Sequence, residues 1–369
     1  MLIGDLQVSK ASDKKILLKH TGSQNITITI EKLASGKNKV CVTHKNTSTK
    51  RFIPYKSWVT SYSIDLIQKI LEIKGPAYLC DEIMRDESPD YLQKSLQYSL
   101  LSYEKKESFA NKTILDFGCG SGSSSLIIAR MLPNVKIIGI DLDKRSLELA
   151  KLRAKHYNLT NIQFLHSKDP QSLPNKTQLG NFDYIILSAV YEHLKPQERK
   201  NLLPQLWDIL SPGGILFINR TPYRYFPLEI HTTGGLPLIN YFPNRLTQWC
   251  AQKFSKKNLQ HDSWDTLLKK GIRGGNPGEI LRILRNTHTQ SHNPTTAKTI
   301  TLENWPVLLK PTNLGIKDRV DLWYHETNTK RYSFIKKSLF LSFKLLKKIT
   351  GSTLAPTLSL AIKKDKKRA

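Results

Sequence analysis

The sequence is short of cysteine, of acidic side chains and of long apolar runs. Its four cysteines stand far apart, without the paired spacing of a disulfide framework or a zinc site. No stretch approaches the roughly 18 continuous apolar residues of a membrane-spanning helix. The first ten residues lack the charged and apolar regions of a signal peptide. We therefore expect a cytoplasmic protein, and we predict no metal site.

The shortage of acidic residues leaves a formal net charge of +27, concentrated at the two ends of the chain. Residues 1–60 carry 11 basic and 3 acidic side chains, and residues 330–369 carry 12 and 1. The long middle, residues 61–329, carries 34 and 26. An anionic partner, whether a phosphate-rich polymer or a membrane surface, should therefore meet the ends first.

The order of the expected elements begins with strands. Apolar and polar residues alternate along residues 1–56, which predicts a small β-rich N-terminal module with a hairpin loop at 35–38. Apolar residues then recur at helical spacing over 61–75, and 79–104 holds one or two further helices. We expect these helices to precede the first strand of a second sheet and to cover its ligand.

From residue 113, short apolar runs alternate with segments that suit helices. The predicted helices are 144–156 and 197–210, and the predicted strands are 113–116, 135–141, 162–165, 184–187, 215–218, 299–302 and 319–324. This alternation predicts an α/β fold, in which a seven-stranded, mostly parallel, Rossmann-like sheet is doubly wound.

These patterns divide the chain into three parts. The β-rich module covers 1–56, a main domain covers 57–329 with a cofactor-binding core at 113–218, and a basic amphipathic tail covers 330–369. A region at about 221–300 is rich in Pro, Gly, Trp, Tyr and His. We interpret it as an insertion that covers the substrate, with helices near 244–254 and 262–271.

The tail contains a helix with two distinct sides. Residues 334–349 place five lysines within about one third of the helical circle, and Leu, Ile and Phe take most of the rest. A basic amphipathic helix of this kind can lie on an anionic membrane, here the inner face of the cell membrane. The alternative is a helix that packs its apolar side on the main domain and leaves its lysines in water.

The segment Thr113–Met131 combines a short apolar run, a glycine-rich turn and a run that suits a helix. Gly118, Gly120 and Gly122 alternate with small residues, so the backbone can turn tightly and approach a ligand closely. This arrangement brings backbone N–H groups and a helix N-terminus against a nucleotide-like ligand. The G-x-G-x-G spacing differs from the G-x-G-x-x-G of NAD-binding folds.

Four blocks between residues 113 and 218 resemble the core of the class I S-adenosylmethionine-dependent methyltransferases. They are Asp116–Gly122, Asp141–Asp143, Ser188–Leu194 and Leu210–Gly214, in the order and spacing of that family. The resemblance implies S-adenosylmethionine as the cofactor. The segment Thr221–Pro243 also resembles a substrate loop of bacterial members that act on small or glycan-like acceptors.

The glycine turn should face the methionine end of this cofactor, with Asp116 receiving its ammonium group. Asp141 would accept hydrogen bonds from both ribose hydroxyls, unless it only starts the following helix, and Leu142 would pack on the adenine. The resemblance also implies an adenine contact at Asp169. The predicted cofactor-binding set is Asp116, Gly118, Cys119, Gly120, Gly122, Asp141, Leu142, Asp169, Ser188 and Ala189, the last two beside the sulfonium.

The candidate catalytic residues are Glu192 and His193, just past the fourth strand, and Glu229 and His231 in the insertion. Methyl transfer to a hydroxyl needs a proton acceptor, which an imidazole can be, and a carboxylate can orient it. Glu192–Leu194 also occurs in the family as a structural turn, so a purely structural role for this pair stays open.

We predict methyl transfer to an oxygen of a small molecule, a sugar or a cell-surface glycan precursor. The aromatic stretches Tyr223–Phe226 and Tyr241–Pro243 suit a pocket for a sugar or ring. The basic charge keeps an RNA methyltransferase as an alternative, although the Asn/Asp-Pro-Pro-Tyr/Phe motif of enzymes that methylate base amines is absent. A non-catalytic cofactor-binding protein of the same fold is the other alternative.

Overall fold

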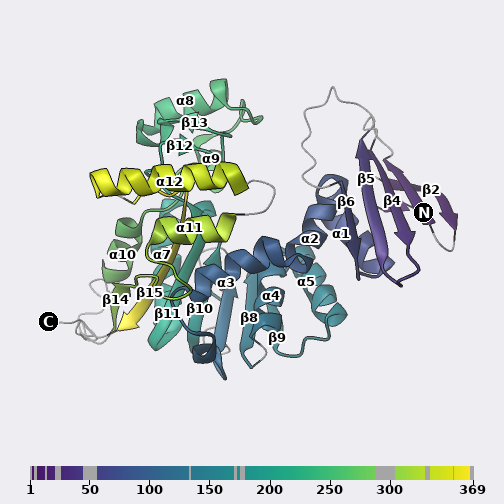
Figure 1. The fold of residues 1–369 in the computed structure, drawn as a ribbon, viewed down its shortest axis with the longest axis horizontal. Helices are drawn as coiled ribbons and strands as arrows, with labels where there is room; N and C mark the ends of the chain where they lie inside the picture. Colours follow the sequence, from purple (N-terminus) through teal and green to yellow (C-terminus); the bar gives the residue numbers. More distant parts are fainter. Residues whose placement is uncertain are drawn as a thin grey trace.

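The computed structural model describes residues 2–3, 6–12, 15–20, 26–44, 56–132, 134–169, 173–174, 179–286, 304–328, 333–351 and 353–365. The described chain forms a small N-terminal sheet and a larger central sheet, which lie side by side in Figure 1. A cap of short helices and strands rises above the central sheet on the side away from the N-terminal module.

The N-terminal module is an antiparallel sheet in which each strand pairs with the next. Its apolar side, which includes Ile26, Ile28 and Ile30, packs on helices α1 (Ile64–Lys74) and α2 (Leu79–Glu87). The structure confirms the predicted β-rich module and extends it to residue 60. The strands are β1 (Leu2–Ile3), β2 (Leu6–Ser12), β3 (Lys15–His20), β4 (Ile26–Lys32), β5 (Asn38–His44) and β6 (Ser57–Thr60).

The central sheet has seven strands in the order β14-β15-β11-β10-β7-β8-β9. Neighbours from β9 to β11 run parallel, and β15 runs antiparallel to both β11 and β14. The predicted doubly wound, mostly parallel sheet is therefore confirmed. Its strands are β7 (Thr113–Phe117), β8 (Lys136–Asp141), β9 (Ile162–His166), β10 (Phe182–Ser188), β11 (Leu210–Pro222), β14 (Trp305–Leu308) and β15 (Thr357–Asp365).

The last two strands differ from those predicted. Residues 319–324 are not a strand, because Arg319–Thr327 forms helix α11, whose N-cap Asp318 accepts the N–H groups of Val320 and Asp321. The predicted strand 299–302 lies outside the described residues. β15 instead completes the sheet, with Leu358, Leu360 and Ile362 buried. The second half of the predicted tail is thus part of the central sheet.

Helices cover both faces of this sheet. One face packs against α7 (Pro196–Ile209) and α10 (Pro277–Asn286), and the other against α3 (Lys94–Leu101), α4 (Ser123–Met131) and α11. Helix α5 (Lys144–His156) has the predicted bounds and contacts α1 of the N-terminal module. Short irregular turns lie at Pro76–Tyr78, Pro89–Gln93, Lys106–Phe109, Tyr191–His193 and Ile239–Tyr241.

The cap is the insertion expected between β11 and the end of the sheet. It contains β12 (Leu228–Glu229), β13 (Leu236–Pro237), α8 (Asn244–Phe254) and α9 (Trp264–Lys269), with a small core of its own around Ile239. The two helices predicted in this region are confirmed, and its end at 287–300 lies outside the described residues. Figure 1 shows α12 (Ser333–Thr350) lying across the molecule beside the cap.

Within the described part of the chain, none of the helices has both the length and the apolar character that crossing a membrane would require.

Candidate active site

A cavity of about 410 Å³ lies at the carboxyl ends of β7, β8 and β10, where the order of the sheet reverses. Ligands of open α/β sheets bind at this position. Gly118 follows β7, Asp141 and Leu142 stand at the end of β8, and Ala189 follows β10. Four of the predicted cofactor residues therefore meet around one cavity.

The carboxylate of Asp141 joins the glycine turn to the end of β8. Its Oδ2 accepts the N–H of Gly120 at 2.7 Å, and its Oδ1 accepts the N–H of Asp143 at 2.9 Å. Each oxygen can accept a further hydrogen bond, so the Asp141 carboxylate can still accept one from a hydroxyl group of a ligand in the cavity. Asp143 caps α5, so Asp141 is not needed for that role.

Gly120 adds space for a ligand beside this carboxylate. Its φ is +55°, and a Cβ at this position would meet no atom within 4 Å. A side chain would therefore be strained and would fill open space in front of the backbone. The residues of the turn thus fit the adenosyl cofactor that the resemblance implies.

The remaining predicted cofactor residues lie beside this cavity, outside its lining. Asp116 is 1% exposed and accepts the hydroxyl of Ser125 at 2.5 Å, and burial raises its pKa to about 6. Ser167, not Asp169, belongs to the lining after β9. Direct contacts from the residues outside the lining stay predictions; these are Asp116, Cys119, Gly120, Gly122, Asp169 and Ser188.

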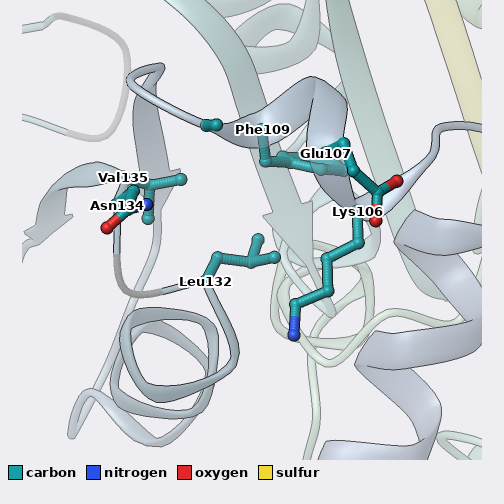
Figure 2. A pocket seen from close by; sticks show the side chains of 7 residues that line it. Lys106, Glu107, Phe109, Leu132, Asn134 and Val135 are labelled. Atoms are coloured by element: carbon teal, nitrogen blue, oxygen red, sulfur yellow. The ribbon is translucent and has the colours of Figure 1, made fainter.

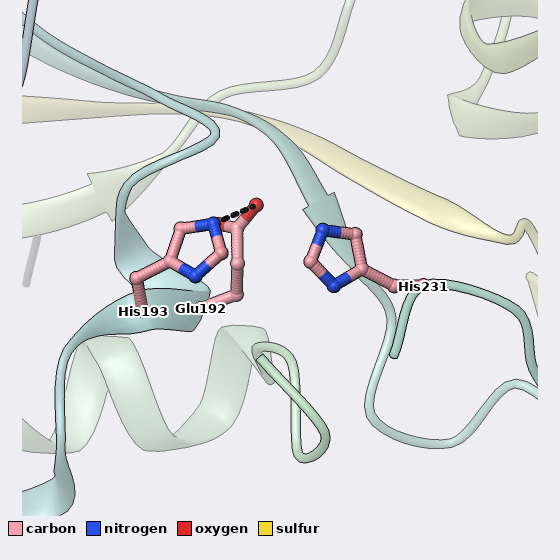
Figure 3. Close-up of side chains that lie close together, drawn as sticks. All are labelled: Glu192, His193 and His231. Carbon is pink, nitrogen blue, oxygen red and sulfur yellow. Dashed lines mark ion pairs between the residues drawn. The ribbon is translucent and has the colours of Figure 1, made fainter. Parts of the chain in front are cut away.

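The candidate catalytic residues Glu192, His193 and His231 come together. Glu192 and His193 lie in the turn after β10, and His231 follows β12 in the cap. One side-chain N or O atom from each of the three lies within 4.8 Å of those of the other two, and the two imidazole centroids are 5.5 Å apart. Figure 3 shows both rings facing the space beside the Glu192 carboxylate. Two imidazoles and a carboxylate can also hold a metal ion.

The hydrogen bond of His193 fixes which nitrogen can act as a base. Its Nδ1 lies 2.7 Å from the carbonyl oxygen of Lys269. Because a carbonyl only accepts, Nδ1 carries the proton, and a neutral His193 presents the lone pair of Nε2. Nε2 is 4.0 Å from Oε1 of Glu192. The geometry therefore presents a proton acceptor next to a carboxylate.

The Glu192 carboxylate is held in a position where it can interact electrostatically with His193. It is 1% exposed, and its Oε2 accepts the hydroxyl of Thr221 at 3.0 Å. Its Oε1 has no hydrogen-bond partner among the described residues. Burial raises the pKa of Glu192. Oε1 would gain a hydrogen-bond partner when His193 takes up a proton, because the protonated Nε2 can donate to it.

His231 is kept neutral by its surroundings. Burial, and then the nearby His193 and Lys257, lower the pKa of His231 to about 4. Gly271 permits this packing, because a Cβ there would lie 2.9 Å from Nδ1 of His231 and 3.2 Å from Cγ of Glu192. The α9–α10 loop therefore fixes the positions of both side chains.

The carboxylate of Glu229 is occupied by backbone hydrogen bonds. It is 3% exposed, and its carboxylate accepts the backbone N–H groups of Thr232 at 2.9 and 3.1 Å and of Thr233 at 2.6 Å. These bonds hold the turn that carries His231. Glu229 is thus placed as a positioning residue, and its contacts give no support for a direct catalytic role.

A second cavity, of about 300 Å³, opens on the other side of the histidine pair. His193 lines the first cavity and His231 lines the second. The second lining includes the predicted aromatic Tyr223 and also Arg220, Arg273, Trp323, Lys336 and Leu339. Sequence reasoning did not place Trp323, Lys336 or Leu339 here, because they come from α11 and α12 and no local motif marks them.

Figure 2 shows a third cavity, of about 390 Å³, at the opposite end of the central sheet. Its lining includes Phe109, Leu132 and Val135, which precede or lie near the amino ends of β7 and β8. Ligands of this fold bind at the carboxyl ends of the strands, so we assign no catalytic role to this cavity.

Comparison with known proteins identifies a methyltransferase domain at residues 114–214. An uncharacterized protein of Rickettsia prowazekii (strain Madrid E) is 32% identical over 106 residues, which are 29% of this chain and 41% of that protein. A ubiquinone biosynthesis O-methyltransferase of Nitrosococcus oceani is 30% identical over 157 residues, 39% of this chain and 64% of that protein. The chain thus spans about half the length of these curated relatives.

Among solved structures, a plantazolicin methyltransferase in complex with a substrate analogue and S-adenosylhomocysteine aligns over 81% of this chain and 95% of that chain. The sequence identity is 15% and the TM-score is 0.40.

Proposed function

Because residues 114–214 belong to the methyltransferase-domain family, we propose that this protein transfers a methyl group from S-adenosylmethionine to an acceptor bound beside His231. One observation carries the proposal: the pair of His193 and His231 stands between two cavities. The first cavity has the cofactor motifs around it, and the second would take the acceptor.

Three side chains of the first cavity, Asp141, Leu142 and His193, then have roles in this proposal. Asp141 would accept the ribose hydroxyls, and Leu142, which is 46% exposed, would pack on the adenine. When bound, the cofactor supplies an electrophilic methyl group on a sulfur that leaves readily. His193 would take the proton of the acceptor hydroxyl at Nε2, and Glu192 would stabilise the imidazolium.

The acceptor atom is oxygen in this proposal, and the acceptor is a small molecule, a sugar or a surface-glycan precursor. The second cavity supports this choice, because about 300 Å³ admits one ring or sugar and the aromatic residues Tyr223 and Trp323 belong to its lining. The net charge of +27 keeps RNA as the second candidate acceptor.

Labelling tests the acceptor class. The full chain is incubated with methyl-labelled S-adenosylmethionine and with separate metabolite, lipid, glycan and RNA fractions of a bacterial extract. We expect label in the metabolite, lipid or glycan fraction, and expect the His193→Ala variant to abolish it. Label confined to RNA would replace the small-molecule proposal. Calorimetry should show micromolar binding of S-adenosylhomocysteine and none of NAD; the opposite result would refute the enzyme class.

We also propose that α12 holds the enzyme at an anionic membrane. The helix packs on the main domain through Phe343, which is 8% exposed, and through two lysines: Lys344 lies 2.8 Å from Asp321 and Lys347 lies 2.6 Å from Asp318. The packed alternative considered from the sequence therefore holds for part of the apolar side, although two of the lysines also contact the domain. The rest of the apolar side faces outward, with Phe334 81% and Ile349 72% exposed.

The charge around this outward side favours a lipid surface over another partner. The outward residues Phe334, Ile335, Leu341, Leu345 and Ile349 are all more than half exposed. Lys337 and Lys348 are exposed on the same helix. Apolar side chains with basic neighbours are the composition of helices that lie in an anionic interface.

Vesicle sedimentation tests the membrane contact without deleting the helix. Phe334→Ser combined with Ile349→Ser should greatly reduce pelleting with vesicles of phosphatidylglycerol, while Leu152→Ser should not, although Leu152 on α5 is also 41% exposed. Equal pelleting of the two variants would show that α12 does not contribute to membrane binding.

A further inference from the structure

The second cavity is lined by three cationic side chains that come from three different elements. Arg220 lies near the carboxyl end of β11, Arg273 lies in the α9–α10 loop, and Lys336 lies on α12. Arg273 is 9% exposed, and the other two are partly buried. Three positively charged side chains therefore line a cavity of about 300 Å³.

None of these cations has a carboxylate within 4.0 Å among the residues that the structure describes. Glu229 lines the same cavity, but backbone N–H groups occupy its oxygens. Glu326 neighbours Arg220 around an adjacent cavity, and burial raises the pKa of Glu326 to about 8. Three cations and the carboxylate of Glu229 therefore line the second cavity, which leaves an excess of positive charge.

The three cations differ in how many of their N–H donors are already used in hydrogen bonds to the protein. Arg273 donates to the carbonyl oxygens of Asn240 and Phe242, each at 2.9 Å, so it contributes mainly charge. The ammonium of Lys336 lies 4.8 Å from the ring centroid of Trp323 and has no hydrogen bond among the described residues. Arg220 likewise has no side-chain hydrogen bond in the described structure.

The backbone of Arg220 supports a functional placement. Its φ is +59°, a left-handed conformation that is unfavourable for a residue with a Cβ. The pairing of β11 with β15 shifts register between Ile218 and Thr221, at this residue, and Arg220 lines two cavities there. Backbone strain of this kind is common at ligand-binding sites, and here it positions the long cationic side chain of Arg220.

Removing cations from water without a counter-ion is unfavourable, and the titration of these groups reflects it. Burial lowers the pKa of Arg220 and of Lys336, and it lowers the pKa of Arg273 to about 10. An anion that enters the cavity would compensate this cost. A single carboxylate brings one negative charge, whereas a phosphate monoester or pyrophosphate brings about two or more.

We propose that the second cavity binds a phosphate group of the methyl acceptor, with Arg220 and Lys336 as its direct contacts and Arg273 adding charge. The inference rests on the proposed function, because it names the acceptor class of that site. The planar fork of an arginine and the point charge of a lysine are both used for phosphate. The phosphate can belong to a soluble sugar phosphate or to a lipid-linked precursor.

Calorimetry on the full chain with inorganic pyrophosphate tests the site. Lys336→Gln and Arg220→Gln should each weaken pyrophosphate binding by about tenfold or more, because a hydrogen bond to a charged group is lost. Lys337→Gln is the matched control: it removes the same charge from the next residue, which is exposed and outside the lining. Its affinity should stay within about twofold of the wild type.

Two results would overturn the inference: no pyrophosphate binding to the wild type, or equal weakening by Lys336→Gln and Lys337→Gln. S-adenosylhomocysteine is titrated into every variant and should bind them all alike. If the wild type fails to bind S-adenosylhomocysteine, the proposed function fails, whatever pyrophosphate does. If it binds S-adenosylhomocysteine but not pyrophosphate, only the phosphate site fails.

A second arm separates the two sources of phosphate. Vesicles with and without a polyprenyl phosphate are sedimented with the wild type and with Lys336→Gln. A lipid-linked acceptor requires that Lys336→Gln lose the extra pelleting caused by the polyprenyl phosphate. Pyrophosphate binding without any such extra pelleting would assign the site to a soluble phosphate.

Discussion

The Glu192→Gln substitution tests the proton-transfer arrangement most directly. In the wild type, Oε1 of Glu192 lies 4.0 Å from Nε2 of His193 and has no hydrogen-bond partner among the described residues. When His193 accepts a proton, a charge pair forms at that distance. At an effective dielectric constant of 20, two unit charges 4 Å apart attract by about 4 kcal/mol. That energy is present after proton uptake and absent before it.

An interaction made only as the proton moves lowers the barrier, so its loss should slow turnover by up to about 10³-fold. Single-turnover methyl transfer measures this, with S-adenosylhomocysteine affinity as the check that the cofactor site is intact. Glu148→Gln, on the exposed side of α5, is the control with the same chemical change. A Glu192→Gln variant within fivefold of the wild type would refute the charge-pair argument.

The same arrangement fixes the sign of the pH dependence. Activity requires a charged Glu192 and a neutral His193. Because burial raises the pKa of Glu192, the acidic loss of activity should begin at a higher pH than for an ordinary carboxyl group. Glu192→Gln should remove that contribution from the pH profile of the turnover rate.

Three further substitutions test the site by parts. Asp141→Ala should weaken S-adenosylhomocysteine binding by ~1–3 kcal/mol in calorimetry, because hydrogen bonds to a charged group are lost; an unchanged affinity would place the ribose elsewhere. His193→Ala should lower turnover by ~10²–10⁴ with cofactor affinity intact, and full activity would remove it as the base. Gly271→Ala should lower turnover by displacing His231, since its Cβ would lie 2.9 Å from Nδ1; a wild-type rate would show that this packing is dispensable.

Much of the cofactor site could be predicted because it is encoded locally. The glycine turn and Asp141 stand at the ends of adjacent strands, and each strand is a short apolar run that a turn or helix follows. α5 was predicted at its observed bounds because its apolar spacing is regular and Asp143 caps its start. Local patterns of this kind can be recognised in the sequence without knowledge of the tertiary structure.

The rest of the site depends on pairings that no local pattern records. The pattern over residues 319–324 predicts a strand, although Asp318 marks a helix start and the buried Val320 and Trp323 are three residues apart, as on one face of a helix. β15 was assigned to the tail because lysines surround it, although residues 358–362 form the apolar run of a buried strand. The second cavity escaped prediction for the same reason: its cations meet only after β15 and α12 have folded back on the domain.

Asp318 connects the docking of α12 to the second cavity, and its substitution is the last test. Its carboxylate caps α11 and accepts from Lys344 at 2.9 Å and from Lys347 at 2.6 Å. Partial burial acts to raise the pKa of Asp318, but the hydrogen bonds from Lys347, the backbone N–H of Asp321 and Lys344 outweigh it and hold the pKa well below its ordinary value. This contribution to stability is therefore present above about pH 4 and is lost as the pH falls below it.

Asp318→Asn separates the cap from the charge, because asparagine caps helices as well as aspartate does. We expect faster hydrogen exchange in α12, little change in the exchange of α11, and a smaller loss of α12 protection on going from pH 5 to pH 3 than in the wild type. Asp318→Ala should loosen both helices, since removing a cap costs about 1 kcal/mol. Because α12 carries Lys336, Asp318→Asn should also weaken pyrophosphate binding, although Asp318 does not line the cavity. Unchanged exchange in α12 would mean that its lysines do not hold it on the domain.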